Sequence, residues 1–186
     1  MSELEKLSPS ILDAAVILSK RYPGIRFLMP AATEKVRQHF ESILRGYPDV
    51  NCEVFSGRAK QVMTAADVVI TASGTATLEI KLVYRPMVVC SRIAQTTYNL
   101  TKWFKMLKTR YFALPNILAG ELLVPELLQH EATGERIADG VIQWLDNPDQ
   151  VNNLKQRFDD LHKVLRIDAA ATAGDVVLRH FAERQN

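Results

Sequence analysis

The chain has 186 residues, of which 47% are apolar and 24% are charged. This length and composition predict one globular domain with a substantial core and exclude two full-sized domains. The formal net charge is only +2. That balance argues against a general nucleic-acid binder, because such a protein needs a concentrated basic face.

Targeting and redox signals are weak in this sequence. No apolar run approaches the ~18–20 residues that span a bilayer, and residues 1–10 lack the apolar stretch of a signal peptide. The only two cysteines, Cys52 and Cys90, lie in apolar, strand-like runs. We therefore expect both cysteines to be buried free thiols in a reducing compartment, which predicts a cytoplasmic location.

Helix and strand patterns alternate along the first half of the chain. Ser8 and Pro9 predict the N-cap and first residue of a helix that ends at Tyr22-Pro23-Gly24. Strands are predicted at 25–29, 52–55, 67–71 and 86–90, and helices at 33–44, 59–66 and 75–83. Apolar strands separated by helices are typical of a parallel sheet covered on both sides. The sequence therefore predicts a Rossmann-like α/β domain.

After residue 115 the strand signals fade and helical spacing dominates. Helices are predicted at 135–145, 151–165 and 169–183. No composition shift marks a domain boundary. We therefore expect a single domain over residues 1–186, with 148–186 as a C-terminal helical extension.

The first candidate site follows the strand at 67–71. Ser73, Gly74 and Thr75 lead from the end of that strand into a helix, where backbone N–H groups attract phosphate. Glu79 follows Thr75 by one helical turn, so both side chains could reach one ligand. The alternative is an ordinary strand-to-helix turn with Glu79 in solvent, and spacing alone does not separate the two interpretations.

The second candidate is a polar set among apolar residues. Asn116, Glu126 and Gln129 occur in LPNILAG and VPELLQ, where prolines and a glycine interrupt an apolar stretch. Buried polar groups need partners, which would make these three residues candidate ligand contacts. Composition alone favours a simpler alternative, in which Asn116 caps a helix and the other two lie on the surface.

The third feature is a basic, aromatic segment. Residues 91–120 contain no acidic residue. Their cations and aromatic rings predict either an anionic membrane interface or a helix that packs its rings inward with its lysines outward. The candidate membrane or acyl-chain contacts are Lys102, Trp103, Phe104, Lys105, Lys108 and Arg110.

Other catalytic signatures are not found in the sequence. The four histidines are scattered and lack partners at metal-ligand spacing, so no zinc site is predicted. Neither a nucleophile elbow nor a P-loop occurs. The catalytic residues therefore remain unassigned.

Taken together, the sequence resembles the lipid-A-disaccharide synthase family. The stretches that carry the resemblance are DVVITASGTATLEIKLVYRPMVV at 67–89 and YFALPNILAGELLVPELLQHEAT at 111–133. The likeness extends over nearly the whole chain. LPN followed by VPELLQ is fairly specific, whereas SGTATLE is looser.

The resemblance implies the C-terminal, UDP-sugar-binding domain of a GT-B glycosyltransferase. The family transfers 2,3-diacylglucosamine from its UDP carrier to 2,3-diacylglucosamine 1-phosphate, releasing UDP and lipid A disaccharide. Ser73, Gly74 and Thr75 are then expected near the UDP phosphates and Glu79 near the ribose. Asn116, Glu126 and Gln129 are expected to line the same pocket. No cofactor or metal is implied.

The resemblance also has a gap at the N-terminus. In the family a strand ends in LPGSR, and residues 1–9 here resemble the helix that follows it. We therefore expect a fragment or a mis-assigned start, lacking the central first strand and the domain with the general base. Two hypotheses follow: the donor half of a peripheral inner-membrane enzyme, completed by an N-terminal half or as a homodimer, or a non-catalytic α/β binding module.

Overall fold

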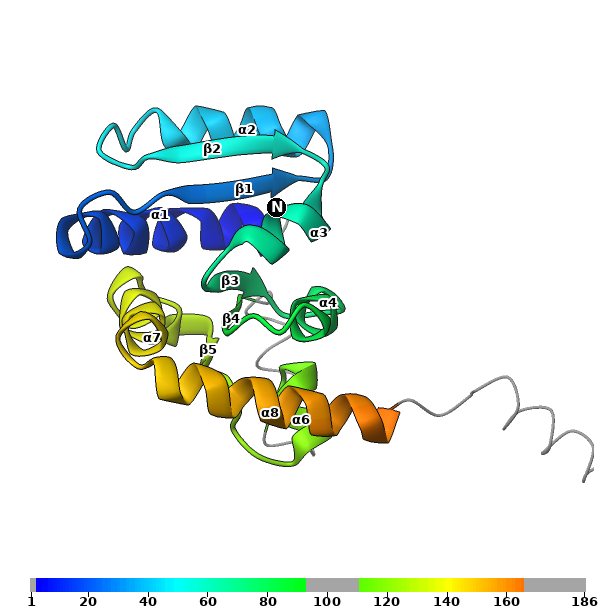
Figure 1. Cartoon of the computed structure of the whole chain (residues 1–186). Coiled ribbons are helices and arrows are strands. Elements are labelled where there is room, and N and C mark those ends of the chain that lie inside the picture. The colour runs from blue at the N-terminus through cyan, green and yellow to red at the C-terminus, as the bar shows by residue number, and fades with distance from the viewer. Residues whose placement is uncertain (1–2, 93–110, 166–186) are drawn as a thin grey trace, which may run out of the picture.

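The computed structural model describes residues 3–92 and 111–165 (Figure 1). The first stretch contains α1 (Glu3–Arg21), β1 (Phe27–Ala31), α2 (Glu34–Leu44), β2 (Cys52–Ser56), α3 (Ala59–Ala65), β3 (Val69–Ala72), α4 (Ala76–Leu82) and β4 (Met87–Ser91). The second contains α6 (Leu114–Ala119), β5 (Glu126–Leu128), the 3-10 helix η1 (Gln129–Glu131), α7 (Gly134–Asp146) and α8 (Pro148–Leu165). The helix predicted at 169–183 lies outside the described residues.

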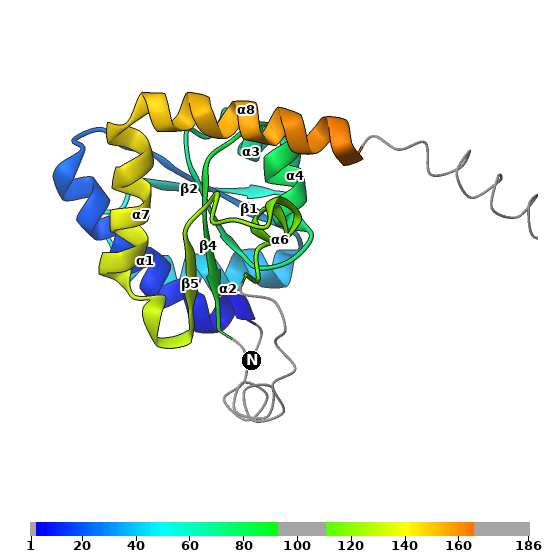
Figure 2. The same cartoon turned by 90° about the horizontal axis from the view of Figure 1, so that it is seen from below.

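The strands form two parallel sheets. β1 pairs with β2 in one sheet, and the order in the other is β3-β4-β5. Helices α1 and α7 lie on one side of the strands and α4 and α6 on the other (Figure 2). Strands with helices on both sides confirm the predicted α/β class.

The break between the sheets falls between β1 and β3. Every residue of β4 is buried because strands flank it on both sides. By contrast, all four residues of β3 and four of the five in β1 are only partly buried.

Among the described helices, α1 and α7 make the most extensive contact with each other. Gly134, the first residue of α7, makes this approach possible. A Cβ built on Gly134 would lie 2.6 Å from the Cβ of Asp13 and 3.2 Å from the backbone N of Ala14. Any side chain at this position would therefore push α7 away from α1.

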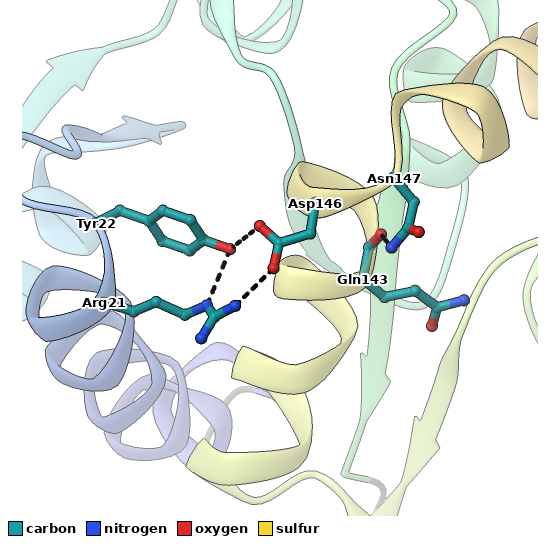
Figure 3. Close-up of polar contacts among 5 residues, drawn as sticks. All are labelled: Arg21, Tyr22, Gln143, Asp146 and Asn147. Atoms are coloured by element: carbon teal, nitrogen blue, oxygen red, sulfur yellow. Dashed lines mark hydrogen bonds and ion pairs between the residues drawn. The ribbon is translucent and has the colours of Figure 1, made fainter.

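Polar contacts join the C-terminal ends of α1 and α7 (Figure 3). Asp146 accepts hydrogen bonds from Arg21 Nη2 at 2.7 Å and from Tyr22 Oη at 2.6 Å. These contacts hold the pKa of Asp146 below its ordinary value, the Tyr22 hydrogen bond being the larger cause. The cluster therefore fixes one end of the helix pair, and Gly134 determines the spacing at the other.

Two local predictions were wrong. Ser8 is buried inside α1 and does not cap it, because the helix begins at Glu3 and contains Pro9. Leu7 is also buried, so core packing on the N-terminal side extends the helix past the proline. The sequence prediction also missed β5, a strand of only three residues that includes a glutamate.

Helix α8 lies across the three-stranded half of the molecule. It packs against α4, α6 and α7 (Figure 2). Phe158 and Leu154 of α8 belong to the main hydrophobic core. Residues 148–165 therefore contribute to the core of the α/β domain.

Candidate functional site

The carboxyl ends of β3, β4 and β5 lie together at one edge of the three-stranded sheet. β3 ends at Ala72, which pairs with Cys90 of β4, and β5 ends beside the last residue of β4. The next residues along the chain, Ser73, Arg92 and Gln129, therefore emerge at the same edge. Ligands of open α/β sheets bind beyond such strand ends, which makes this edge the candidate site.

Ser73 joins the β3–α4 loop to the segment before α6. Its backbone N–H donates to the carbonyl oxygen of Cys90 at 3.1 Å, which extends the β3–β4 ladder by one bond. Its hydroxyl donates to the carbonyl oxygen of Phe112 at 3.3 Å. The loop is thereby held at the strand edge by both main-chain and side-chain contacts.

The loop after Ser73 has an exposed outer face. Gly74 has φ +137°, a backbone conformation that favours glycine. Its carbonyl accepts hydrogen bonds from Thr77 N at 3.1 Å and Thr77 Oγ1 at 2.7 Å. Gly74, Thr75 and Glu79 are exposed. The exposure of Glu79 agrees with both the ligand interpretation and the solvated alternative.

Asn116 is fully buried and its amide is saturated with hydrogen bonds. Its Nδ2 donates to the Val124 carbonyl at 2.8 Å and to Glu126 Oε1 at 2.8 Å. Its Oδ1 accepts from the backbone N–H groups of Leu123 at 2.9 Å and Val124 at 3.0 Å. These four bonds use all the capacity of an asparagine amide, two donors and two acceptor lone pairs.

Glu126 holds the same segment from β5. Its Oε1 accepts the backbone N–H of Ala113 at 2.7 Å, and both carboxylate oxygens lie within 3.2 Å of the Phe112 nitrogen. Both main-chain polar groups of Phe112 are therefore hydrogen-bonded: its N–H donates to Glu126, and its carbonyl oxygen accepts from Ser73. The structure thus brings Ser73, Asn116 and Glu126 together around one turn of chain.

The simpler alternative is wrong for Asn116. Asn116 lies inside α6 and does not cap it, because the N-cap residue is Ala113. Glu126 and Gln129 are partly buried. The proline and glycine that interrupt the apolar run mark the two ends of a short helix, which Asn116 ties to the chain that follows it.

Gln129 lies at the end of β5 in an unusual backbone conformation. Its φ is +55°, in the left-handed region that non-glycine residues seldom adopt. Its carbonyl accepts the Nε–H of Arg92 at 3.4 Å. Sequence reasoning did not select Arg92 for this site, although its position directly after an apolar strand was a usable signal.

Helix α4 also buries a cation behind the loop. Lys81 is 2% exposed, and burial lowers the pKa of its ammonium group. A buried ammonium loses hydration, so the charged form is disfavoured. We expect Lys81 to reduce the stability of the fold at neutral pH.

Several further expectations concern groups or segments elsewhere. The predicted membrane contacts between Lys102 and Arg110 lie outside the described residues. Within residues 3–92 and 111–165, no helix is both long and apolar enough to cross a bilayer. In the same ranges, histidine, cysteine and acidic side chains do not gather in groups suited to a metal ion.

The chain is similar to known proteins over almost its whole length. The family profile described as Lipid-A-disaccharide synthetase matches residues 1–178. The chain belongs to this family. One relative is the lipid-A-disaccharide synthase of Xanthomonas campestris pv. campestris (strain 8004), which is 40% identical to this chain over 185 residues. The corresponding enzyme of Neisseria meningitidis serogroup A is 41% identical over 180 residues.

Coverage of these relatives is unequal. The matched regions include 98% and 96% of this chain but 42% and 46% of the two relatives. This member of the Lipid-A-disaccharide synthetase family therefore spans less than half the length of those proteins. Among solved structures, one described as the glycotransferase of kitacinnamycin has a TM-score of 0.41 and 14% identity, covering 83% of this chain and 43% of that one.

Proposed function

We propose that this chain is the donor-binding half of a lipid-A-disaccharide synthase. The complete enzyme transfers 2,3-diacylglucosamine from its UDP carrier to 2,3-diacylglucosamine 1-phosphate, which yields lipid A disaccharide and UDP. The family match over residues 1–178 is the observation that carries the proposal. The gathering of Ser73, Arg92 and Gln129 at one strand edge supports it.

The proposed residues have two kinds of role. Gly74 and Thr75 are exposed and lie where the diphosphate of UDP would be held, and Glu79 is one turn further along the same exposed face. Asn116 contributes by holding the wall of the pocket, because its amide is already saturated. Glu126 keeps capacity on Oε2 for a ligand hydroxyl, and Gln129 lies at the adjoining strand end.

Chemistry at this edge is electrostatic. UDP leaves with developing negative charge on its diphosphate. Neutral N–H and O–H donors at fixed positions stabilise such charge without reorganising during the reaction. We assign this role to Gly74 and Thr75 of the loop that Ser73 holds in place through its own hydrogen bonds. The general base stays unassigned.

Calorimetric titration of UDP into the purified chain tests the donor half of the proposal. We expect saturable binding that Glu79→Gln and Gln129→Ala each weaken by about tenfold, the effect of losing one good ligand contact. Glu53→Gln is the matched control, since Glu53 is an exposed glutamate on the other sheet. A folded chain that does not bind UDP would favour the alternative of a non-catalytic module.

We further propose that catalysis requires a complementing N-terminal half. The break between β1 and β3 supports this, because their facing edges are not paired with each other. Co-expression with the unmatched part of the Xanthomonas campestris relative should restore UDP release in the presence of both sugar lipids. Release by this chain alone as a homodimer would contradict the proposal, and size-exclusion chromatography would identify that dimer.

We propose a peripheral association with the cytoplasmic face of the inner membrane. The support is the composition of the segment that contains Lys102, Trp103 and Arg110. Sedimentation with phosphatidylglycerol vesicles should exceed that with phosphatidylcholine vesicles and should fall with added salt. Equal sedimentation with both lipids would contradict the proposal.

A further inference from the structure

Arg92 makes a set of contacts that joins three parts of the fold. Its guanidinium donates to the carbonyl oxygen of Lys6 at 3.0 Å and to Ser10 Oγ at 3.0 Å, both on α1. It also donates to the carbonyl oxygens of Ala132 at 2.7 Å and Gln129 at 3.4 Å. A single side chain at the end of β4 thus connects α1 with the turn that follows β5.

The contacts reach both ends of that turn. The backbone N–H of Ala132 donates to the Gln129 carbonyl at 3.3 Å, which closes η1, and Arg92 binds the carbonyls of the same two residues. Gln129 adopts φ +55° within the turn. A glutamine in this conformation is sterically disfavoured, so it persists only where surrounding contacts hold it.

The other end of the connection is rigid. Ser10 is 7% exposed, and α1 is packed along α7. Ala132 is fully buried. The guanidinium therefore lies between a well-packed helix and a turn with an unfavourable backbone conformation, and its planar array of donors contacts both.

We propose that Arg92 is a positioning residue for the nucleotide site. It holds the Gln129 turn against α1 and thereby places the Gln129 side chain at the edge where the strand ends meet. This inference deepens the proposed function and rests on it for the identity of the ligand. Arg92 acts through Gln129 and makes no contact with the nucleotide in this scheme.

The geometry also predicts that lysine is a poor substitute for Arg92. The guanidinium uses Nε for Gln129, Nη1 for Lys6, and Nη2 for Ser10 and Ala132. A lysine ammonium has three donors on one atom, which cannot span partners on opposite sides of the guanidinium. Arg92→Lys should keep the fold while losing part of the hold on the turn.

A double-mutant cycle on UDP affinity tests whether Arg92 works through Gln129. We expect Arg92→Gln to weaken UDP binding about tenfold in the wild-type background and less than about twofold in the Gln129→Ala background. Arg92→Lys should fall between wild type and Arg92→Gln. The matched control is Arg21→Gln, which removes the other arginine that ties α1 to a distant segment and should leave UDP affinity unchanged.

A structural role alone gives a different pattern. Equal losses from Arg92→Gln in both backgrounds would overturn the inference, as would an equal loss from Arg21→Gln. If Arg92→Gln does not fold, the UDP affinity of Arg92→Lys is compared in the wild-type and Gln129→Ala backgrounds instead. Equal losses in the two backgrounds would again overturn the inference.

Failure of the proposed function is distinguishable from failure of this inference. If the wild-type chain does not bind UDP, the proposed function fails and amide hydrogen exchange still tests the role of Arg92. The Ala132 amide should then exchange about tenfold faster in Arg92→Lys than in Arg21→Gln. Equal exchange in the two variants would overturn the positioning role.

Discussion

The side-chain amide of Asn116 and the carboxylate of Glu126 hold each other at 2.8 Å, which joins α6 to β5. The same amide also forms hydrogen bonds with the backbone of Leu123 and Val124. The same carboxylate accepts hydrogen bonds from the backbone N–H groups of Phe112 and Ala113. Two residues thus organise the whole connection from 112 to 126. Their importance to the site lies in the shape that they impose on it.

Asn116→Asp should destabilise the fold by about 2–4 kcal/mol, because it replaces two donors with a second buried carboxylate beside Glu126. The loss should be smaller at acidic pH, where protonation of the introduced carboxyl group removes its charge. Urea denaturation between pH 4 and 8 measures this. Asn147→Asp is the control, since that amide is exposed and donates to the Gln143 carbonyl (Figure 3). Equal losses in the two variants would contradict the prediction.

Gly134→Ala should destabilise the fold by about 1–3 kcal/mol, the usual cost of overpacking. The new Cβ would approach the Cβ of Asp13 at 2.6 Å and neighbouring α1 backbone at 3.2 Å, and backbone cannot move aside cheaply. Thermal unfolding is the measurement. Asp139→Ala, at an exposed position of the same helix, should be nearly neutral, and a neutral Gly134→Ala would show that α1 and α7 are not tightly packed.

Lys81→Met should stabilise the fold by about 1 kcal/mol at pH 7, because methionine keeps the buried stem and removes the desolvated charge. Burial lowers the pKa of Lys81, so the unfolded state binds more protons and wild-type stability rises with pH. The advantage of the variant should therefore shrink as pH rises toward about 10.4, the ordinary lysine value. Chemical denaturation at pH 7 and 10 checks it, with exposed Lys60→Met as the control.

Asp146→Asn should cost stability at neutral pH but not in strong acid. The hydrogen bonds from Tyr22 and Arg21 lower the pKa of Asp146, so its contribution is present above the unfolded-state pKa of about 4 and is lost as pH falls through the folded-state value. Urea midpoints from pH 7 down to pH 2 should show wild type and variant converging. A difference that stays constant over that range would contradict the ion-pair explanation.

Local patterns in the sequence were sufficient for most of the elements. The helix predicted at 33–44 matches α2, whose cap is Thr33, and the predicted strand at 52–55 lies within β2. Strands β3 and β4 were found to within two residues at each end. These predictions succeed because continuous apolar runs and capping residues act within a few positions of one another.

Features that depend on tertiary contacts could not be predicted from these local patterns. Pro9 lies inside α1 because burial of Leu7 outweighs the local preference for a helix start. β5 exists because β4 offers it a partner, and its three residues carry too little pattern of their own.

The sequence by itself determined the α/β class, the family and the list of polar residues worth testing. Only the tertiary structure decided how those residues divide, with Asn116 saturated in the wall of the site and Glu79 exposed beside it. It also brought Arg92 to Gln129 across 37 positions of the chain. The physical reason is that a hydrogen-bond partner depends on how the elements pack, and spacing along the chain does not encode it.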